Sequence, residues 1–364
     1  IVIRPSYVLG GRAMMIVYDD EEMAEYFALH VGKQKLEHPV LIDKFLENAI
    51  EVDVDALSDG EDVYVAGVME HIEEAGIHSG DSSCVLPPYS LPAETVAEIE
   101  RQTVALAKEL RVVGLMNIQF AVKDGVVFIL EVNPRASRTA PFVSKATGVP
   151  LPRLATQVML GKTLKELDPW SMRRSGYVSV KESVFPFRRF PGVDILLGPE
   201  MRSTGEVMGI APTFEEAFLK GQWGAGQKLP EGGKVFLSVN DRDKRFVAEV
   251  ARQYVDLGFE LLATSGTAGL LAGQGIPSTR VLKVYEGRPN IVDLIKNGEV
   301  SLVINTASGK RTAHDSKAIR QATLHYGVPY STTLSGAKAI ARAIGAARTT
   351  EVRVKSLQEY YKGE

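Results

Sequence analysis

Three side chains with oxygen atoms, Gln119, Glu131 and Asn133, fall on two neighbouring stretches in which apolar and polar residues alternate. This alternation predicts the two strands of a hairpin, over 115–123 and 126–133, and we expect both strands to bury their even-numbered residues. Residues that face each other then have numbers of the same parity, which sets Gln119 opposite Glu131. The three side chains would therefore share one face of the hairpin.

The connection between these strands contains Asp124-Gly125, a common turn pair. A two-residue turn would pair residues of opposite parity and would bury the wrong face of one strand. We therefore predict a three-residue connection through Asp124, Gly125 and Val126, with a bulge.

Two amide oxygens and a carboxylate on a rigid sheet are hard ligands that suit Mg²⁺ carrying nucleotide phosphates. Asn133 is followed by Arg135 and Arg138, whose guanidinium groups suit a phosphoryl or carboxylate group and the charge of a transition state. An ordinary half-exposed hairpin with surface arginines has the same pattern, so the residues alone leave both interpretations open.

A glycine pair follows the first strand. The run from Arg4 to Arg12 contains Gly10 and Gly11, whose bare backbone lets phosphates approach closely. A plain hairpin turn has the same pattern.

Two other features have ordinary interpretations. Glu51, Asp53 and Asp55 alternate with apolar residues, as in any half-exposed strand, so this pattern alone assigns Glu51 to the surface. Cys84 has no basic neighbour in the sequence, and we expect a small apolar residue without chemical function.

The elements that must position these residues divide the chain in two. In the first half the patterns predict helices and strands, namely strands at 1–3, 14–18, 40–44, 50–56 and 63–69 and helices at 20–31 and 92–110. Beyond the Gly-rich run 221–233, strands and helices alternate, which predicts a small parallel α/β domain with ligands at the carboxyl ends of its strands. The predicted strands there include 279–284. We expect domains at 1–222 and 235–364, joined by a linker over 223–234.

Composition limits the class of protein. The 364 residues, 45% of them hydrophobic, suffice for two or three domains, and the net charge of -3 gives no reason to expect a nucleic-acid or membrane partner. The longest uncharged stretch, 261–279, is too polar to span a membrane, and a single cysteine suits a reducing compartment, so we expect a cytoplasmic protein. The chain opens on Ile1-Val2-Ile3, which is typical of the inside of a strand, so we expect that it begins within a longer polypeptide.

Several segments together resemble the large chain of carbamoyl-phosphate synthase: RPSYVLGGRAM at 4–14, MEHIEEAGIHSGD at 69–81, NIQ at 117–119 and EVNPRASRT at 131–139. The resemblance continues through PFVSKATG at 141–148 and LGPEMRSTGEVM at 197–208, and from Val235 onward to the regulatory domain. It covers nearly the whole sequence. The implied fold is of mixed α/β and α+β class, a partial ATP-grasp fold followed by a small parallel-sheet domain like methylglyoxal synthase.

The resemblance implies ATP-dependent phosphorylation of carbamate to carbamoyl phosphate, a ligase reaction of arginine and pyrimidine biosynthesis. Gln119, Glu131 and Asn133 would hold two Mg²⁺ or Mn²⁺ ions, K⁺ is a further candidate ion, and Asn133, Arg135 and Arg138 would act in catalysis. The residues that would bind ATP are Arg4, Gly10, Gly11, Asp43, Leu46, Glu51, Gly76, Ile77, His78, Ser79, Gln119 and Glu131.

The second half implies control by effectors. A nucleotide monophosphate would bind Ser238, Lys244, Thr264, Thr267, Lys283 and Asn305, although Thr264 to Thr267 is equally a helix N-cap. Ornithine would bind three carboxylates and two residues near the C-terminus, namely Glu73, Asp81, Glu182, Tyr330 and Thr332, although carboxylates on loops usually serve only solubility. Arg288 stands where methylglyoxal synthases carry a catalytic carboxylate, so synthase activity is not expected.

The family's large chain has a first synthetase unit and a further lobe ahead of the segment that matches Ile1. The implied partners are that missing N-terminal part and a glutaminase small chain, and an oligomer is expected. An alternative function is a regulatory and assembly module that binds effectors and partner chains without turning over ATP. A different ATP-grasp ligase is a third interpretation, because that superfamily shares the hairpin chemistry.

Overall fold

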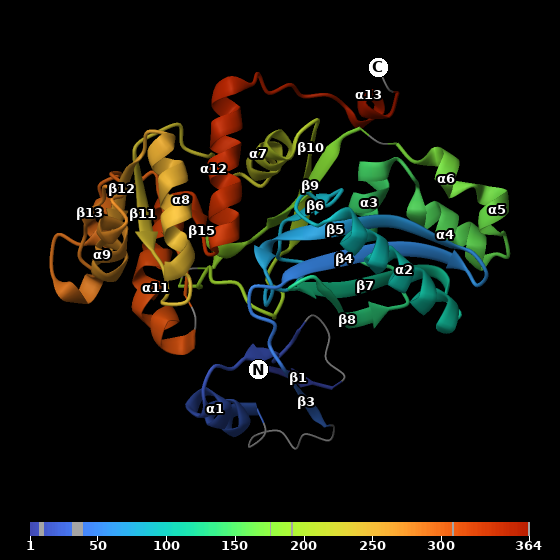
Figure 1. The fold of residues 1–364 in the computed structure, drawn as a ribbon, viewed down its shortest axis with the longest axis horizontal. Coiled ribbons are helices and arrows are strands. Elements are labelled where there is room, and N and C mark those ends of the chain that lie inside the picture. Colours follow the sequence, from blue (N-terminus) through green and yellow to red (C-terminus); the bar gives the residue numbers. More distant parts are fainter. Residues whose placement is uncertain (7–10, 31–38, 175, 191, 308, 363–364) are drawn as a thin grey trace.

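The computed structural model describes residues 1–6, 11–30, 39–174, 176–190, 192–307 and 309–362. These residues form three β-sheets with helices packed on them (Figure 1). None of the described helices is both long and apolar enough to cross a membrane.

A small antiparallel sheet lies at the N-terminal end, in the order β2 (Met15–Ile16), β1 (Val2–Pro5) and β3 (Val40–Asp43). Helix α1 (Asp20–His30) lies beside it, and Ile3, Val17 and Tyr26 form a small buried core. Figure 1 shows this unit in blue, projecting from the rest of the molecule.

A seven-stranded antiparallel sheet carries the predicted cation ligands Gln119, Glu131 and Asn133, and also Glu51. Its strands are, in spatial order, β10 (Gly205–Ala211), β9 (Val178–Val184), β6 (Cys84–Leu86), β5 (Val63–Glu74), β4 (Ile50–Asp59), β7 (Val113–Lys123) and β8 (Val126–Asn133). One face packs on α2 (Ala93–Glu109), whose apolar stripe includes Ile99. The other face packs on α3 (Ala140–Thr147) and α4 (Leu151–Met159), and the short helices α5 (Leu164–Leu167) and α6 (Pro169–Met172) follow.

A five-stranded parallel sheet forms the C-terminal part, in the order β13 (Thr279–Arg280), β12 (Glu260–Ala263), β11 (Lys234–Ser238), β14 (Leu302–Asn305) and β15 (Tyr330–Ser331). Its helices are α8 (Lys244–Asp256), α9 (Ser265–Gly273), α10 (Ile291–Lys296), α11 (Gly309–Tyr326) and α12 (Leu334–Thr349). The last helix, α13 (Leu357–Lys362), returns to the first part, where Tyr360 donates to the Ile210 carbonyl at 3.0 Å. Short 3₁₀ helices lie at Phe187–Arg189 (η1) and Val284–Glu286 (η2).

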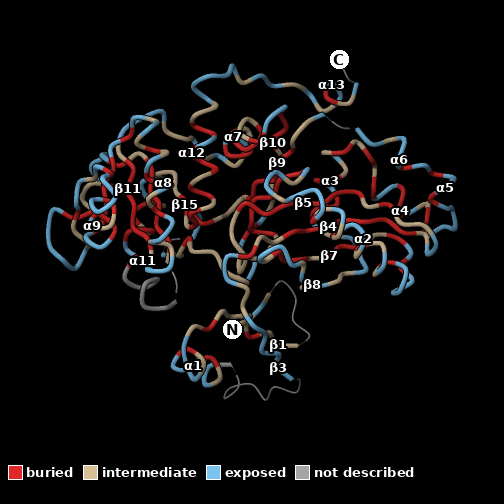
Figure 2. Tube along the Cα trace, viewed as in Figure 1, coloured by how far each residue is buried: buried red, intermediate tan, exposed pale blue. Residues whose placement is uncertain are grey.

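One apolar core joins the two larger sheets. Helix α7 (Phe214–Gly224) packs on β9 and β10, and α12 packs on both α7 and α8. The buried cluster around these helices contains Val180 and Phe218 from the first part and Leu237, Tyr254 and Ile340 from the second. Figure 2 shows buried chain running through α7 and α12 from one sheet to the other.

The hairpin differs from its prediction in one respect. Gln119 faces Glu131, as expected, but Lys123 pairs with Val126, so the turn has two residues and the predicted three-residue connection is wrong. The bulge lies instead within β8, where the register shifts between the Gln119 and Phe120 pairs.

The bulge reverses which face β8 presents. Phe128 pairs with Ala121 before the bulge and is 39% exposed, as Val126 is 54% exposed, so the prediction that both even-numbered sets are buried is wrong for these two. Beyond the bulge Val132 packs on the core as predicted. The bulge in β8 allows a two-residue turn at one end of the strand and still places Glu131 opposite Gln119 at the other end.

Two other boundaries need correction. Helix α7 continues to Gly224, so residues 221–224 are helical where a connection was expected. The strand expected over 279–284 pairs only at Thr279–Arg280, and its last residue begins the 3₁₀ helix η2.

Candidate active site

The acidic residues of β4 are buried or partly buried, contrary to the surface interpretation of this strand. Asp53 and Asp55 are each 1% exposed, and Glu51 is partly buried. Glu51 accepts a hydrogen bond from the backbone N–H of Gly76 at 3.0 Å, and burial raises the pKa of its carboxyl. The period-2 pattern gave the correct strand but not the elements that cover its polar face.

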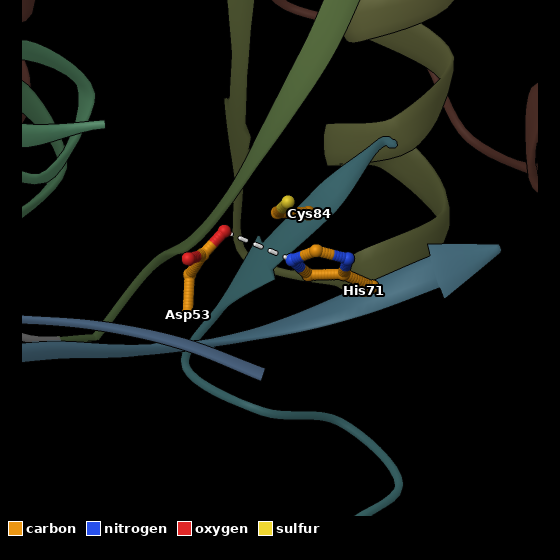
Figure 3. A group of neighbouring side chains, drawn as sticks. All are labelled: Asp53, His71 and Cys84. Atoms are coloured by element: carbon orange, nitrogen blue, oxygen red, sulfur yellow. Dashed lines mark hydrogen bonds and ion pairs between the residues drawn. The ribbon is translucent and has the colours of Figure 1, made fainter. Parts of the chain in front are cut away.

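His71 lies between two of these carboxylates. Its Nε2 is 3.0 Å from Asp53 Oδ2, and its Nδ1 is 3.5 Å from Glu51 Oε2. Figure 3 shows Asp53, His71 and the buried Cys84 together, with potential ligand atoms within 4.8 Å of one another. Burial opposes a charge on the imidazole, but Cys84 and the bond to Asp53 hold the pKa of His71 well above its usual range.

The basic neighbour of Cys84 comes from another strand. Cys84 pairs directly with His71 across β5 and β6, so the sequence around Cys84 gave no signal of it. Cys84 is otherwise a buried core residue, as expected.

Asp55 receives three side-chain hydrogen bonds. Ser137 Oγ donates to Asp55 Oδ1 at 2.7 Å, Thr139 Oγ1 donates to Oδ2 at 2.6 Å, and Asn117 Nδ2 donates to Oδ1 at 3.0 Å. Burial raises the pKa of Asp55 to about 6 in spite of these donors. The sequence pattern gives no sign that Asp55 is a functional candidate, because its partners lie 62 to 84 residues away in the chain.

The expected cation ligands lie on neighbouring strands. Gln119 and Glu131 pair across β7 and β8, and Asn133 Nδ2 donates to Glu131 Oε1 at 2.6 Å. Gln119 Nε2 donates to Ser79 Oγ at 2.9 Å, which ties the 78–81 turn to this sheet. Side-chain oxygens of this kind, gathered on two paired strands, fit the hard-ligand chemistry of Mg²⁺.

The arginines follow β8 at once. Arg135 Nη2 donates to Asn133 Oδ1 at 3.2 Å, and Arg138 lies 4.0 Å from Glu206 on β10. His78 and Arg138 are electrostatic neighbours, and burial lowers the pKa of His78. These contacts bring the arginine segment and the 78–81 turn to the same region as the cation ligands.

The remaining ATP-site candidates fall into two groups. Arg4 and Asp43 pair at 3.3 Å in the small sheet, where both are solvent-accessible. Gly11 has a φ of +68°, and a Cβ there would lie 1.9 Å from the Pro199 carbonyl oxygen, so a glycine is required at this close approach. Gly10 lies outside the described residues.

A pocket of about 150 Å³ joins the second group to the C-terminal part. Gly76 and Ile77 line it, together with Phe45, next to the expected adenine contact at Leu46. Arg242 closes its far side, where Nη1 lies 2.9 Å from Glu47 Oε1.

The expected nucleotide-effector residues gather at the carboxyl ends of the parallel strands. Thr264 Oγ1 donates to Ser238 Oγ at 3.3 Å, and Asn305 Nδ2 donates to the Ser238 carbonyl at 3.1 Å. Thr267 Oγ1 accepts from the N–H of Val239 at 3.5 Å, in the first turn of α9.

The two lysines of this set lie farther out. Lys244 begins α8 and pairs with Asp241 at 2.5 Å, and its Nζ lies 3.3 Å from where a Cβ on Gly266 would be. Lys283 lies with its Nζ 5.7 Å from the centre of the Tyr285 ring. Lys244 is thus beside the N-terminus of α9, where a phosphate would be favoured.

The expected ornithine residues are only partly brought together. Ser83 Oγ lies 2.8 Å from Glu182 Oε2 and 3.3 Å from Glu73 Oε1, and Tyr330 is an electrostatic neighbour of Glu182. Asp81 instead accepts the backbone N–H groups of Arg202 and Ser203, each at 2.8 Å. Thr332 lines the pocket beside Gly76.

The carboxylates of this group are not exposed loop residues. Glu73 and Glu182 lie on strands β5 and β9, and Asp81 and Glu182 are 1% and 8% exposed. Burial and the neighbouring Glu73 raise the pKa of Glu182 to about 8.

Comparison with known proteins identifies two regions. Residues 1–167 match the family model described as "Carbamoyl-phosphate synthase L chain, ATP binding domain", and residues 247–332 match the "MGS-like domain". The carbamoyl phosphate synthase large chains of Gemmatimonas aurantiaca and Archaeoglobus fulgidus are each 55% identical over 100% of this chain, which covers 33% and 34% of theirs. The "Carbamoyl phosphate synthase large chain, C-terminal section" of Methanocaldococcus jannaschii is 52% identical over 99% of this chain and 60% of its own.

The chain therefore spans about a third of the length of the first two relatives. The matched families, the antiparallel seven-stranded sheet and the parallel five-stranded sheet confirm the expected fold class, a partial ATP-grasp fold followed by a methylglyoxal-synthase-like domain. Two family models match in order, and more than half of all residues are identical to those of these relatives, so the chain is similar to carbamoyl phosphate synthase large chains along its whole length.

Proposed function

We propose that this chain carries the ATP-dependent phosphorylation of carbamate to carbamoyl phosphate, as part of a carbamoyl phosphate synthase. The observation that carries the proposal is the group formed by Gln119, Glu131 and Asn133 with Arg135 and Arg138 directly after them. Oxygen ligands beside guanidinium groups suit phosphoryl transfer, which needs positioning and charge stabilisation more than a protein nucleophile.

The reaction balances without an added proton. A carboxylate oxygen of carbamate forms a bond to the γ-phosphorus of ATP, and the bond from that phosphorus to the β-γ bridging oxygen breaks, so that ADP leaves with the electron pair. Two bound Mg²⁺ or Mn²⁺ ions would neutralise phosphate charge. Gln119, Glu131 and Asn133 would hold these ions, and Arg135 and Arg138 would bind the transferred phosphoryl oxygens.

Other residues of the same face would orient the nucleotide. Glu51, which accepts from Gly76, would accept the ribose hydroxyls, and residues near Leu46 and Ile77 would contact the adenine. His78 and Ser79 would approach the phosphates from the turn that Gln119 holds. Arg4, Asp43 and Gly11 would act from the small sheet.

The C-terminal part would regulate this reaction. Within the proposed division into 1–222, a linker at 223–234 and 235–364, a nucleotide monophosphate would bind beside Lys244 and Ser238. Ornithine would bind beside Glu73 and Glu182, whose buried carboxyl groups suit its amines. Such control suits an enzyme that serves arginine and pyrimidine biosynthesis in the cytoplasm, with K⁺ as a further ion.

The proposed partners are the remainder of the large chain and a glutaminase small chain, in an oligomer. A regulatory and assembly module is the second candidate function, favoured by one observation: the expected effector residues Ser238, Thr264 and Asn305 contact one another at the carboxyl ends of the parallel strands. Such a module would bind effectors without turning over ATP.

The reaction run backwards tests the proposal. Carbamoyl phosphate, Mg²⁺ and ADP should give ATP, and Glu131→Gln should lower the rate about a hundredfold or more, because a metal ligand contributes several kcal/mol. Glu109→Gln, at the end of α2 and exposed, is the matched control and should leave the rate unchanged. No ATP from the unaltered chain, with a nucleotide monophosphate still binding by calorimetry, would favour the regulatory module.

A further inference from the structure

The segment between β8 and α3 is held by one buried carboxylate. Ser137 and Thr139, the two neighbours of Arg138, donate to different oxygens of Asp55, at 2.7 Å and 2.6 Å. The backbone of Arg138 is therefore fixed on both sides by a single group of β4. Asn117 adds a third donor from β7.

Asp55 is suited to this contact because all its side-chain partners are donors. Two hydroxyl groups and an amide N–H donate to Asp55, and an ionised carboxylate can only accept hydrogen bonds. Because Asp55 is 1% exposed, water does not compete for these bonds. The charged residue facing Asp55 is Asp53 on the same strand, which Asn117 also contacts at 3.5 Å. A carboxylate receives stronger hydrogen bonds than a neutral acceptor.

Arg138 itself needs such support. Its side chain is 41% exposed and its carboxylate contact, Glu206, is 4.0 Å away. Because this side chain is long, partly exposed and only loosely ion-paired, the position of its guanidinium group depends chiefly on how firmly its backbone is held.

We infer that Asp55 is a positioning residue for phosphoryl transfer: through Ser137 and Thr139 it fixes the backbone of Arg138, so that the guanidinium reaches the transferred group. The inference rests on the proposed function, in which Arg138 binds that group. Asp55 does not touch substrate and acts only through the segment it holds.

A purely structural role is the competing interpretation, because Ser137 Oγ also accepts from the N–H of Ala140, the first residue of α3, at 2.9 Å. Loss of this bond would destabilise the fold without special effect on Arg138. A double-mutant cycle separates the two roles, since residues that act as a unit are non-additive.

The first experiment measures ATP formation from carbamoyl phosphate and Mg·ADP. Asp55→Asn should lower kcat about a hundredfold, with the KM for ADP changed less than twofold, because a misplacement of about 1 Å has that effect. In an Arg138→Ala background the same substitution should have little further effect. An equal loss in both backgrounds would overturn the inference.

Asp59→Asn is the matched control. Asp59 lies on the same strand and accepts backbone N–H groups of Asp62 and Leu164, each at 2.7 Å, away from the arginine segment. It should lower thermal stability while leaving kcat within twofold. A hundredfold loss of kcat in this control would show that general destabilisation explains Asp55→Asn.

The second experiment needs no turnover. Hydrogen exchange at residues 137–140 should be about tenfold faster or more in Asp55→Asn, as expected for a lost bond to a charged group, and unchanged in Asp59→Asn. Unchanged exchange in Asp55→Asn would overturn the anchor. If the unaltered chain makes no ATP, the proposed function fails, while this exchange still decides whether Asp55 fixes the segment.

Discussion

Glu182 is an acid that burial and Glu73 keep largely protonated at neutral pH, since they raise its pKa to about 8. Binding of a diamine such as ornithine should ionise it. Between pH 6 and 7 we therefore expect release of about one proton per ornithine, with affinity weakening about tenfold per pH unit below 8. Calorimetry in two buffers of different ionisation enthalpy measures this proton, and Glu182→Gln should abolish it. Heat that does not depend on the buffer would contradict the assignment.

The same acid affects stability. Because the folded chain holds its proton up to about pH 8 while an unfolded glutamate loses it near 4.5, this contribution is full below about pH 4.5 and falls as pH rises towards 8. The sign is opposite to that of an acid in a salt bridge.

His71 is the cation among Glu51, Asp53 and Cys84. His71→Leu should destabilise the chain by about 3–5 kcal/mol at neutral pH, because it leaves buried carboxylates without their positive partner. The raised pKa of His71 means that its contribution is full below about pH 6.5 and is lost as pH rises through the folded value. Urea unfolding at pH 6 and pH 9 measures both effects. If His71→Leu left the urea midpoint of unfolding unchanged at both pH values, His71 would be neutral in the folded chain and would not stabilise the neighbouring carboxylates.

At the scale of elements, β10 and α7 meet at a glycine. A Cβ on Gly209 would lie 1.9 Å from the Ala217 carbonyl oxygen and 2.6 Å from the Gly221 nitrogen. Gly209→Ala should therefore push α7 away and cost about 3 kcal/mol, at the upper end for overpacking. Gly205→Ala on the same strand meets nothing within 4 Å and serves as the control. Equal thermal shifts for both variants would show that backbone entropy, and not the close approach, decides.

The elements of the hairpin show what a sequence can and cannot predict. Alternation predicted both strands and the pair of Gln119 with Glu131, because the period of 2 links register to the buried face. Alternation misplaced the bulge, because a register shift inside β8 and a three-residue turn both set Glu131 opposite Gln119. The covered acids at Asp53 and Asp55 were missed for another reason: their partners, His71 for Asp53 and the segment 137–139 for Asp55, are distant in sequence.

At the scale of the whole molecule, a buried ion pair joins the two larger parts. Arg320 on α11 is 0% exposed and bonds Asp194 in a forked arrangement, with both distances 2.6 Å. Asp194→Ala should cost about 3 kcal/mol or more, because the guanidinium stays buried without this carboxylate. Glu351→Ala, which breaks the exposed pair with Arg353, should change stability by less than about 1 kcal/mol. Calorimetry compares them, and equal small effects would mean that water replaces Asp194.

The way the two larger parts of the chain pack together was harder to predict than their fold classes. Strand and helix alternation beyond residue 234 gave the parallel sheet, because each unit is local in sequence. Helix α12 was not anticipated, and it carries much of the core that both parts share. The periodicity of apolar residues can predict a helix and its buried face, but it does not show which other element that face packs against.

The bulge in β8 makes the register at the turn independent of the register at Glu131, whereas in a regular strand one register would set both. Residues on the turn side follow one parity, and Glu131 and Asn133 follow the other, so a change in turn length need not shift Glu131 and Asn133. The hairpin tip at Asp124-Gly125 is consequently a place where related chains can gain or lose residues without loss of chemistry, and where a label or a tag can be inserted.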